Sequence, residues 1–230
     1  MRLILVRHGQ TPANVAGVIA TSAPGPGLTE LGHRQAAQIP AALRNDPIDA
    51  IFVSTLQRTR LTATPLAEDR GLELIELPGI HEIEAGDLEG RTDHDAVRQY
   101  LGAAFAWGMG DRDATMPGAP DGHAFFARFD TDVAAIAERL ADVADPTAVI
   151  VSHGAALRVW VAASATNVPP SFAGEHELDN TGIVELSGSP EEGWTLLSWQ
   201  GMPVGGPAFV DAEAEDPTGE SLSEAEADAR

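Results

Sequence analysis

The chain has 230 residues, 43% of them hydrophobic, a length that accommodates one ordinary globular domain with a sizeable core. It contains no cysteine and its 14 basic residues are all arginine, which excludes disulfides, thiolate nucleophiles, lysine-dependent phosphate loops and Schiff bases. The net charge of −21 argues against nucleic-acid binding, so an anionic substrate must be small and held by a local cluster of positive charge.

The apolar runs of the sequence are too short to cross a membrane. Leu3 to Val6 and Ala148 to Val151 fall far below the roughly 20 residues that a membrane helix needs. Met1 leads directly into a strand-like segment instead of a signal peptide. We therefore expect a cytoplasmic protein that has no membrane partner.

The first part of the chain alternates strand-like and helix-like segments. Arg2 to Val6 and Ala50 to Ser54 are short, branched apolar runs that predict strands buried on both faces of a mainly parallel sheet. Leu28 to Leu43 has apolar residues at helical spacing, and Thr29 is a suitable N-cap for that helix. Leu56 to Asp69 predicts a second helix.

Proline and glycine mark the limits of the next elements. Pro65 is expected to bend or interrupt the second helix, and Gly71 to end it. The alternating pattern of Leu72 to Leu77 predicts another strand. This succession of strands and helices indicates an α/β sandwich.

The later part of the chain contains an insertion, a strand and a hairpin. The pattern weakens between Gly90 and Phe126, where we expect an insertion over one end of the sheet. Ala148 to Ser152 predicts a further buried strand. Gly182 to Leu186 and Thr195 to Trp199 predict a hairpin near the sheet edge, which offers a pairing surface for a homodimer.

The C-terminal end differs in composition from the rest. Residues 211–230 carry a net charge of −7, and residues after about 203 have few large apolar side chains. We expect no packed structure there. The predicted organisation is thus one domain over residues 1–203, with a cap insertion over about 90–126, followed by a flexible acidic tail over 204–230.

Two histidines follow predicted strands directly, each with glycine after it. His8-Gly9 comes after the first strand and His153-Gly154 after the strand that ends at Ser152. In a parallel α/β sheet the loops at the carboxyl ends of the strands line the ligand crevice. Glycine there lets backbone N–H groups approach an anion closely, so we expect an anion site that includes Gly154.

Arg58 and Glu82 are expected at the same edge of the sheet. Arg58 lies near the start of the helix that follows the second strand, and Glu82 follows the strand that ends at Leu77. Glu84 and Glu89 are alternatives to Glu82, although each is more typical of a solvated residue or of one that structures a loop.

These residues fall within five ordered motifs that resemble the histidine phosphatase superfamily, in its phosphoglycerate-mutase-like branch. The resemblance covers residues 2 to about 186. The motifs are Leu5-Val6-Arg7-His8-Gly9-Gln10-Thr11 with Asn14, Leu28-Thr29-Glu30-Leu31-Gly32, Ser54 to Arg58 with Thr62-Ala63, Glu82-Ile83 with Gly86-Asp87-Leu88-Glu89-Gly90, and Val151-Ser152-His153-Gly154.

The resemblance implies a three-layer α/β/α fold with a small cap and a phosphoenzyme mechanism that needs neither a metal nor an organic cofactor. It also assigns roles to residues. His8 matches the nucleophile, Glu82 the proton donor, Arg7, Arg58 and His153 the cations of the phosphate pocket, and Asn14 a phosphate-contacting residue.

The chemistry of these side chains agrees with the implied roles. A neutral imidazole is a competent nucleophile toward phosphorus, and two guanidinium groups beside His8 should lower its pKa. The same guanidinium groups can bind phosphoryl oxygens with two hydrogen bonds each. Glu82 would protonate the departing ester oxygen and later take a proton from water.

Other polar residues have simpler interpretations. His33, His94 and His176 have polar neighbours and are expected at the surface, whereas His81 adjoins Glu82 and could reach the site. Arg158, one turn beyond Gly154, is more typical of a structural arginine. The aromatic residues of the insertion could form a lid over a partly apolar substrate, but ordinary packing onto the sheet is favoured.

Three functions remain open on the sequence. A phosphoglycerate mutase needs extra cations for the substrate carboxylate, and residues 83–130 provide only four arginines among many acids. A non-catalytic phosphate binder should lack a catalytic group, and none is missing. Hydrolysis of a small phosphorylated metabolite is therefore favoured over both alternatives.

Overall fold

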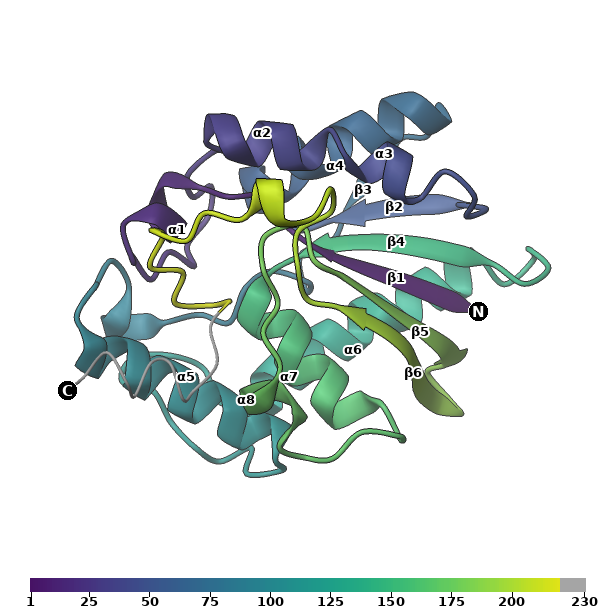
Figure 1. Cartoon of the computed structure of the whole chain (residues 1–230). Helices are drawn as coiled ribbons and strands as arrows, with labels where there is room; N and C mark the ends of the chain where they lie inside the picture. Colours follow the sequence, from purple (N-terminus) through teal and green to yellow (C-terminus); the bar gives the residue numbers. More distant parts are fainter. Residues whose placement is uncertain (220–230) are drawn as a thin grey trace.

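A six-stranded mixed sheet forms the centre of the protein. The computed structural model describes residues 1–219, and the strands occur in the order β3-β2-β4-β1-β5-β6 (Figure 1). The first four of these strands are parallel, and β5 and β6 join antiparallel at one edge. The strands are β1 (Arg2–Arg7), β2 (Ala50–Val53), β3 (Leu74–Glu76), β4 (Thr147–Ser152), β5 (Ile183–Ser189) and β6 (Gly193–Gln200).

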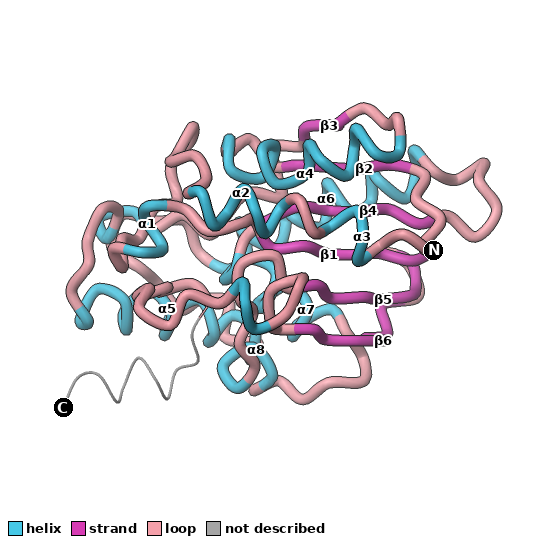
Figure 2. Tube along the Cα trace, turned by 45° about the horizontal axis from the view of Figure 1, so that its top comes forward, coloured by secondary structure: helices cyan, strands magenta, loops and turns pink. Residues whose placement is uncertain are grey.

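Helices cover both faces of this sheet, which gives the three expected layers. Helices α2, α3 and α4 lie on one face, and α6 and α7 lie on the other (Figures 1 and 2). The helices are α1 (Pro12–Val15), α2 (Glu30–Ala36), α3 (Ile39–Ala42), α4 (Gln57–Arg70), α5 (His94–Gly108), α6 (Gly122–Arg139), α7 (Gly154–Ser164) and α8 (Phe172–Glu175). Two short 3₁₀ turns, η1 (Gly86–Leu88) and η2 (Pro207–Phe209), complete the elements.

The central strands are apolar without interruption because both of their faces are buried. In β1, Leu3 and Leu5 belong to the hydrophobic cluster on one side of the sheet, and Ile4 and Val6 to the cluster on the other. All four side chains are fully buried. Since successive side chains of a strand point to opposite faces, this pattern fixes β1 in the middle layer and carries His8 to its carboxyl end.

One predicted helix is divided in two, and a proline explains the division. The helix predicted over 28–43 is split into α2 and α3, with Pro40 at the second position of α3. Pro40 has no N–H and its ring would clash with the carbonyl of Ala36 in a continuous helix. In contrast, α4 runs uninterrupted through Pro65 and ends as predicted at Gly71, whose φ of 65° is left-handed.

The insertion contains a helix that the sequence analysis did not predict. Asp93 caps the N-terminus of α5 through the backbone N–H of Ala96, a signal that could have located the start of this helix. Helix α5 packs against α7 and α8. Trp107 and Phe125 are almost fully buried and stack on each other, so the interpretation of these aromatic residues as core packing is confirmed.

The prediction that no packed structure follows residue 203 is wrong for residues 204–219. This segment turns back across the carboxyl edge of the sheet, between α1 and α7 (Figure 1). Val204 is buried in the core on the α3 and α4 face, and the Phe209 carbonyl accepts a hydrogen bond from Gln35. The composition shows that this segment is acidic, but it does not show which residues elsewhere in the chain bind its side chains. Residues 220–230, the rest of the predicted tail, lie outside the described residues.

Within residues 1–219, no helix combines the length and the apolar character needed to cross a membrane.

Candidate active site

His8 lies at the carboxyl end of β1 with its ring held in one tautomer. Its Nδ1 is 2.9 Å from the carbonyl oxygen of Gly9, which can only accept, so Nδ1 carries the proton. The other ring nitrogen, Nε2, has no hydrogen-bond partner among residues 1–219 and keeps its lone pair. Gly9 is required here because a Cβ would lie 2.7 Å from the carbonyl oxygen of Gly32.

The surroundings of His8 favour the neutral imidazole. Burial, followed by the positive charges of Arg58 and Arg7, lowers the pKa of His8 well below the usual histidine value. The expected effect of the two guanidinium groups is therefore present, with burial as the largest cause. The ring of His153 lies 5.2 Å away between centroids, so the two predicted histidines meet.

His153 has one buried ring nitrogen with a partner and one without. Its Nε2 lies 2.7 Å from the Oγ of Ser54. The same Oγ accepts from the backbone N–H of Leu56 and lies 3.1 Å from the Thr59 hydroxyl, so the donor in the contact with His153 depends on the tautomer of the imidazole. The other ring nitrogen, Nδ1, is buried and has no partner within residues 1–219. Burial and the charges of Arg58 and His8 lower the pKa of His153.

Arg58 also has buried N–H groups without partners. One nitrogen, Nη2, donates to the carbonyl of Ala20 at 3.1 Å, whereas Nε and Nη1 have no partner in the described part of the chain. Burial lowers the pKa of Arg58 to about 10, with Glu82 partly opposing the shift, so the guanidinium stays charged at neutral pH. Each buried donor left without an acceptor costs about 1–3 kcal/mol, a cost that a bound anion would remove.

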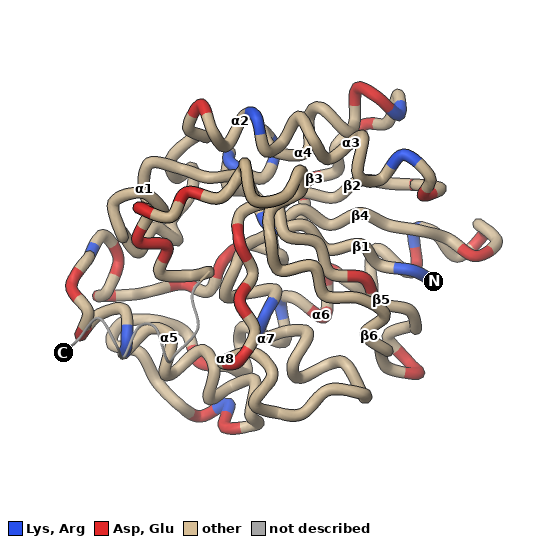
Figure 3. The backbone as a smooth tube through the Cα atoms, in the orientation of Figure 1, with Lys and Arg blue, Asp and Glu red and all other residues tan. Residues whose placement is uncertain are grey.

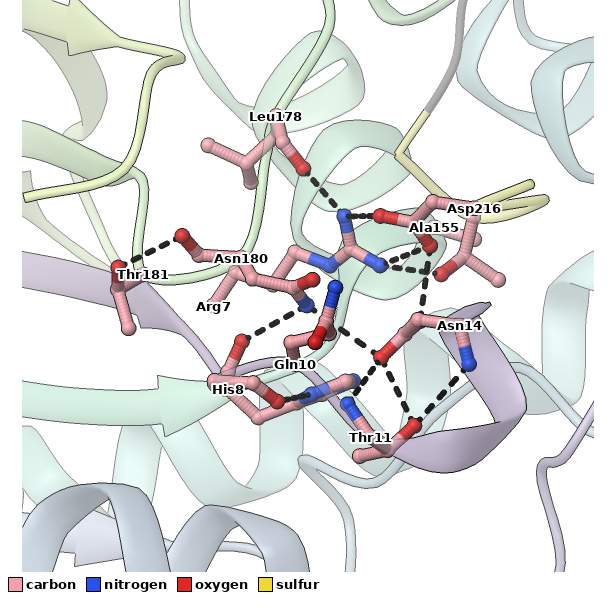
Figure 4. Close-up of polar contacts among 12 residues, drawn as sticks. Arg7, His8, Gln10, Thr11, Asn14, Ala155, Leu178, Asn180, Thr181 and Asp216 are labelled. Carbon is pink, nitrogen blue, oxygen red and sulfur yellow. Dashed lines mark hydrogen bonds and ion pairs between the residues drawn. The ribbon is translucent and has the colours of Figure 1, made fainter. Parts of the chain in front are cut away.

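Arg7 and Asn14 complete the predicted anion site, and a carboxylate occupies them. Asp216 accepts two hydrogen bonds from Arg7, of 2.5 and 2.6 Å, and a third of 2.8 Å from Nδ2 of Asn14 (Figure 4). The side-chain amide of Asn14 cannot be flipped, because its Oδ1 accepts a hydrogen bond of 2.9 Å from the backbone N–H of Thr11. Burial lowers the pKa of Arg7, but the pairing with Asp216 more than offsets this and raises it overall.

Glu82 is buried beside this donor cluster, which we define as Arg7, Asn14, Arg58 and His153. Its carboxylate accepts the backbone N–H groups of Ala156 at 2.8 Å, Ile83 at 2.9 Å and Ala155 at 3.3 Å. Two of these groups belong to the first turn of α7, so the start of this helix fixes the orientation of the Glu82 carboxyl group.

His8, Arg58 and Glu82 line one small cavity. Its volume is about 10 Å³, and Pro217 and Thr218 form part of its wall. Such a space holds about one water molecule. The structure thus brings the predicted nucleophile, cation and proton donor together at the carboxyl edge of the sheet, with the C-terminal segment over them.

The alternative proton donors have structural roles. Glu89 accepts hydrogen bonds from the backbone of Thr21 and Ser22 and from the Thr21 hydroxyl, so it fixes that loop. Glu84 pairs with His81 and Arg128. Burial of Glu84 opposes ionisation, but these two partners overcome it and lower its pKa to about 2.

A larger cavity of about 410 Å³ opens next to these residues. Its wall includes Thr21, Leu56, His81, Glu84 and Glu89. His81 therefore lies near the site as the sequence suggested, facing this second cavity. The carboxylates of Glu84 and Glu89 give the cavity an acidic lining.

The remaining predictions divide between structural and surface roles. Arg158 is fully buried and donates to the Ala173 carbonyl, so its structural interpretation is confirmed. His33 and His94 are exposed as predicted, whereas His176 is half-buried and stacks on Phe172 at 3.8 Å. Stacking on an aromatic neighbour overrides the polarity of the sequence around His176.

Gly154 and two further residues show what sequence reasoning missed. A Cβ on Gly154 would lie 2.9 Å from Nε of Arg7 and 2.5 Å from the Thr218 carbonyl oxygen, so glycine allows close packing here. The contact of Ser54 with His153 was not predicted, although Ser54 stands at the end of a strand in the quoted motif. Asp216 could not be found, because nothing local to it marks an arginine more than 200 residues away.

Comparison with known proteins identifies the family. The profile of the histidine phosphatase superfamily (branch 1) matches residues 3–201. The chain belongs to this superfamily. The matched range contains His8, Arg58, Glu82 and His153, and it ends before Asp216.

Curated relatives and solved structures agree with this membership. The chain is 41% identical over 214 residues to the PE-PGRS family protein PE_PGRS11 of Mycobacterium tuberculosis, which covers 87% of this chain but only 36% of that protein's length. It is 37% identical to the adenosylcobalamin/alpha-ribazole phosphatase of Salmonella typhimurium over 70% of this chain and 78% of that protein. A solved mycobacterial glucosyl-3-phosphoglycerate phosphatase, 28% identical, covers 86% of this chain and 98% of its own with a TM-score of 0.72.

Proposed function

We propose that the protein is a phosphomonoester hydrolase that forms a phosphohistidine on His8. The observation that carries this proposal is the arrangement around His8. Its neutral Nε2 stands beside buried donors of Arg58 and His153 that have no partner in residues 1–219. The three terminal oxygens of a phosphate monoester dianion would supply the acceptors that these donors need.

In the first step the Nε2 lone pair of His8 attacks phosphorus and the bond to the ester oxygen breaks. Arg58 and Arg7 hold the phosphoryl oxygens during transfer, and Asn14 Nδ2 and His153 Nδ1 donate to the same group. The departing alkoxide is a strong base, so it takes a proton from Glu82. In the second step water attacks phosphorus, its proton passes to Glu82, and the phosphorus–nitrogen bond breaks to release phosphate.

The second cavity supports hydrolysis over mutase activity. A mutase has to hold the carboxylate of phosphoglycerate near the phosphate site, yet Glu84 and Glu89 line the adjoining space. The arginines of residues 83–130 already have other partners: Arg91 pairs with Asp93, Arg98 with Asp95 and Arg128 with Glu84, and Arg112 lies over the Phe126 ring. An uncharged or cationic leaving group is the better occupant of this cavity.

The substrate is therefore a small phosphorylated metabolite. Two of the relatives named above are, by their names, an adenosylcobalamin/alpha-ribazole phosphatase and a glucosyl-3-phosphoglycerate phosphatase, which supports this class for the present chain. Metal independence belongs to the same proposal. Within residues 1–219 no three His, Asp or Glu side chains gather as a metal site.

The decisive test is labelling with a ³²P-labelled aryl phosphate, without added metal, followed by a quench in alkaline detergent. The wild type should release inorganic phosphate and carry acid-labile label, and His8→Asn should do neither. Label on another residue, or turnover by His8→Asn, would refute the proposal. Interconversion of 2- and 3-phosphoglycerate would indicate the mutase alternative, and phosphate-competitive binding without turnover would indicate the binder.

Two predictions from the sequence stay predictions. The cytoplasmic location and the homodimer have no direct test in the structure. The hairpin of β5 and β6 does lie at the sheet edge, with β6 outermost, so its edge remains the pairing surface to examine.

A further inference from the structure

The carboxylate of Asp216 is bound as a phosphate would be. It receives two parallel hydrogen bonds from the Arg7 guanidinium and one from the Asn14 amide (Figure 4). Guanidinium groups bind carboxylate and phosphate oxygens with the same two-bond geometry. Asp216 thus fills the half of the donor cluster formed by Arg7 and Asn14.

The segment that carries Asp216 is anchored on both sides. We call residues 211–219 the C-terminal strap. Upstream of Asp216, Asp211 accepts a hydrogen bond of 2.8 Å from Gln10. Downstream, the Thr218 hydroxyl accepts from Arg7 at 2.9 Å, and the Gly219 carbonyl accepts from the backbone N–H of Leu178 at 3.2 Å. The contact with Arg7 is therefore part of a docked segment.

Close packing of this segment shuts the site. A Cβ on Gly219 would lie 2.3 Å from Nη1 of Arg7, so the backbone touches the guanidinium directly. Pro217 and Thr218 wall the 10 Å³ cavity beside His8, which is too small for a phosphoryl group. A substrate phosphate cannot reach His8 unless the strap moves.

We propose that the C-terminal strap is an intramolecular competitor of the substrate, with the Asp216 carboxylate occupying the phosphoryl position. This inference rests on the proposed function. A phosphate dianion displaces the strap because it brings more charge than one carboxylate and reaches donors that the strap leaves unpartnered, on Arg58 and His153. The closed strap lowers the apparent affinity for any anion by the fraction of molecules in which it is open.

The acidic surroundings of the strap support its release once it is undocked. Figure 3 shows acidic residues along the strap and on the neighbouring segment before β5, which includes Glu175, Glu177 and Asp179. Like charges repel each other, and the ion pair of Asp216 with Arg7 opposes such repulsion while the strap is docked.

The test is a calorimetric titration of the full chain with inorganic phosphate at neutral pH. Asp216→Asn and Asp216→Ala should bind phosphate at least about fivefold more tightly than the wild type, the lower end of typical coupling between two binding events in one protein. The matched control is Glu213→Gln, which removes one negative charge from an exposed position of the same strap. Its phosphate affinity should stay within about twofold of the wild type.

Two results would overturn the proposal. Unchanged or weaker phosphate binding in both Asp216 variants would show that the carboxylate does not compete. An equal gain in phosphate affinity in Glu213→Gln would show a general effect of charge and not a specific binding of the Asp216 carboxylate to Arg7. Phosphate binding needs no turnover, so the two proposals can fail separately. If the Asp216 variants show no gain in phosphate affinity, the labelling of His8 still tests the proposed function. If His8 is not labelled, the titration still tests whether Asp216 competes with phosphate. Thermal unfolding of each variant confirms that it is folded.

Discussion

The two halves of the donor cluster differ in how their charges are satisfied. Both terminal nitrogens of Arg7 and the Asn14 amide bond to Asp216, which leaves Nε of Arg7 without a partner, whereas Arg58 has two buried nitrogens without partners in residues 1–219 and His153 has one. A satisfied arginine contributes to the folded state, and an unsatisfied one costs stability until an anion binds. The first half therefore serves both folding and binding, and the second serves binding alone.

Arg58→Met should separate binding from folding, and it should have the largest effect on activity of the variants discussed below. Removal of a charged donor to the transferring phosphoryl group should reduce kcat/KM by about 10²–10³-fold, as for other preorganised donors. The free energy of unfolding should stay within about 1 kcal/mol of the wild type, because the lost group was poorly satisfied. Steady-state kinetics and urea unfolding measure both. A loss of several kcal/mol in stability would contradict the contrast between the halves.

Arg7→Met should instead affect stability as well as activity. The variant leaves Asp216 and the Leu178 carbonyl without their guanidinium partner. Breaking a buried pair costs about 3–5 kcal/mol, and the partial exposure of Asp216 reduces the expected loss to about 2–3 kcal/mol. Urea unfolding of Arg7→Met beside Arg58→Met gives the comparison directly. Equal stability of the two variants would show that the strap contact does not hold in solution.

Acid should destabilise the protein through the two buried histidines. Because the folded pKa of His8 and His153 lies below the unfolded value near 6.5, the unfolded chain binds more protons in this window. The contribution of these two histidines to the free energy of unfolding is therefore fully present above about pH 7 and falls as the pH decreases below 6.5. Each histidine contributes about 1.4 kcal/mol per pH unit. His8→Asn should show a shallower loss between pH 6.5 and 5 in chemical unfolding, and an identical slope would contradict the depressed pKa of His8.

The candidate site could be predicted from the sequence only in part. His8 and His153 each follow a buried strand directly, and Arg58 begins the helix after another, so sheet topology alone brings them together. The strap lacks such a local cause, since the partners of Asp216 are 202 and 209 residues away and no strand carries it there. The alternation of apolar strands and helices likewise predicted the α/β sandwich, whereas helix α5 was missed despite its Asp93 cap.

Ser54→Ala should have the smallest effect on activity. It tests how the imidazole of His153, in the second half of the donor cluster, is oriented. The prediction assumes that the Ser54 hydroxyl, 2.7 Å from Nε2 of His153, donates to it and so keeps the proton on Nδ1, the nitrogen that would meet the phosphoryl oxygen. Without that donor, part of the neutral His153 population carries its proton on Nε2 and presents a lone pair to the anion. The loss of one hydrogen bond, about 1 kcal/mol, should lower kcat/KM about fivefold. Ser54→Thr, which retains the hydroxyl, should recover most of this loss, whereas equal impairment of both variants would assign the effect to packing rather than to the proton on His153.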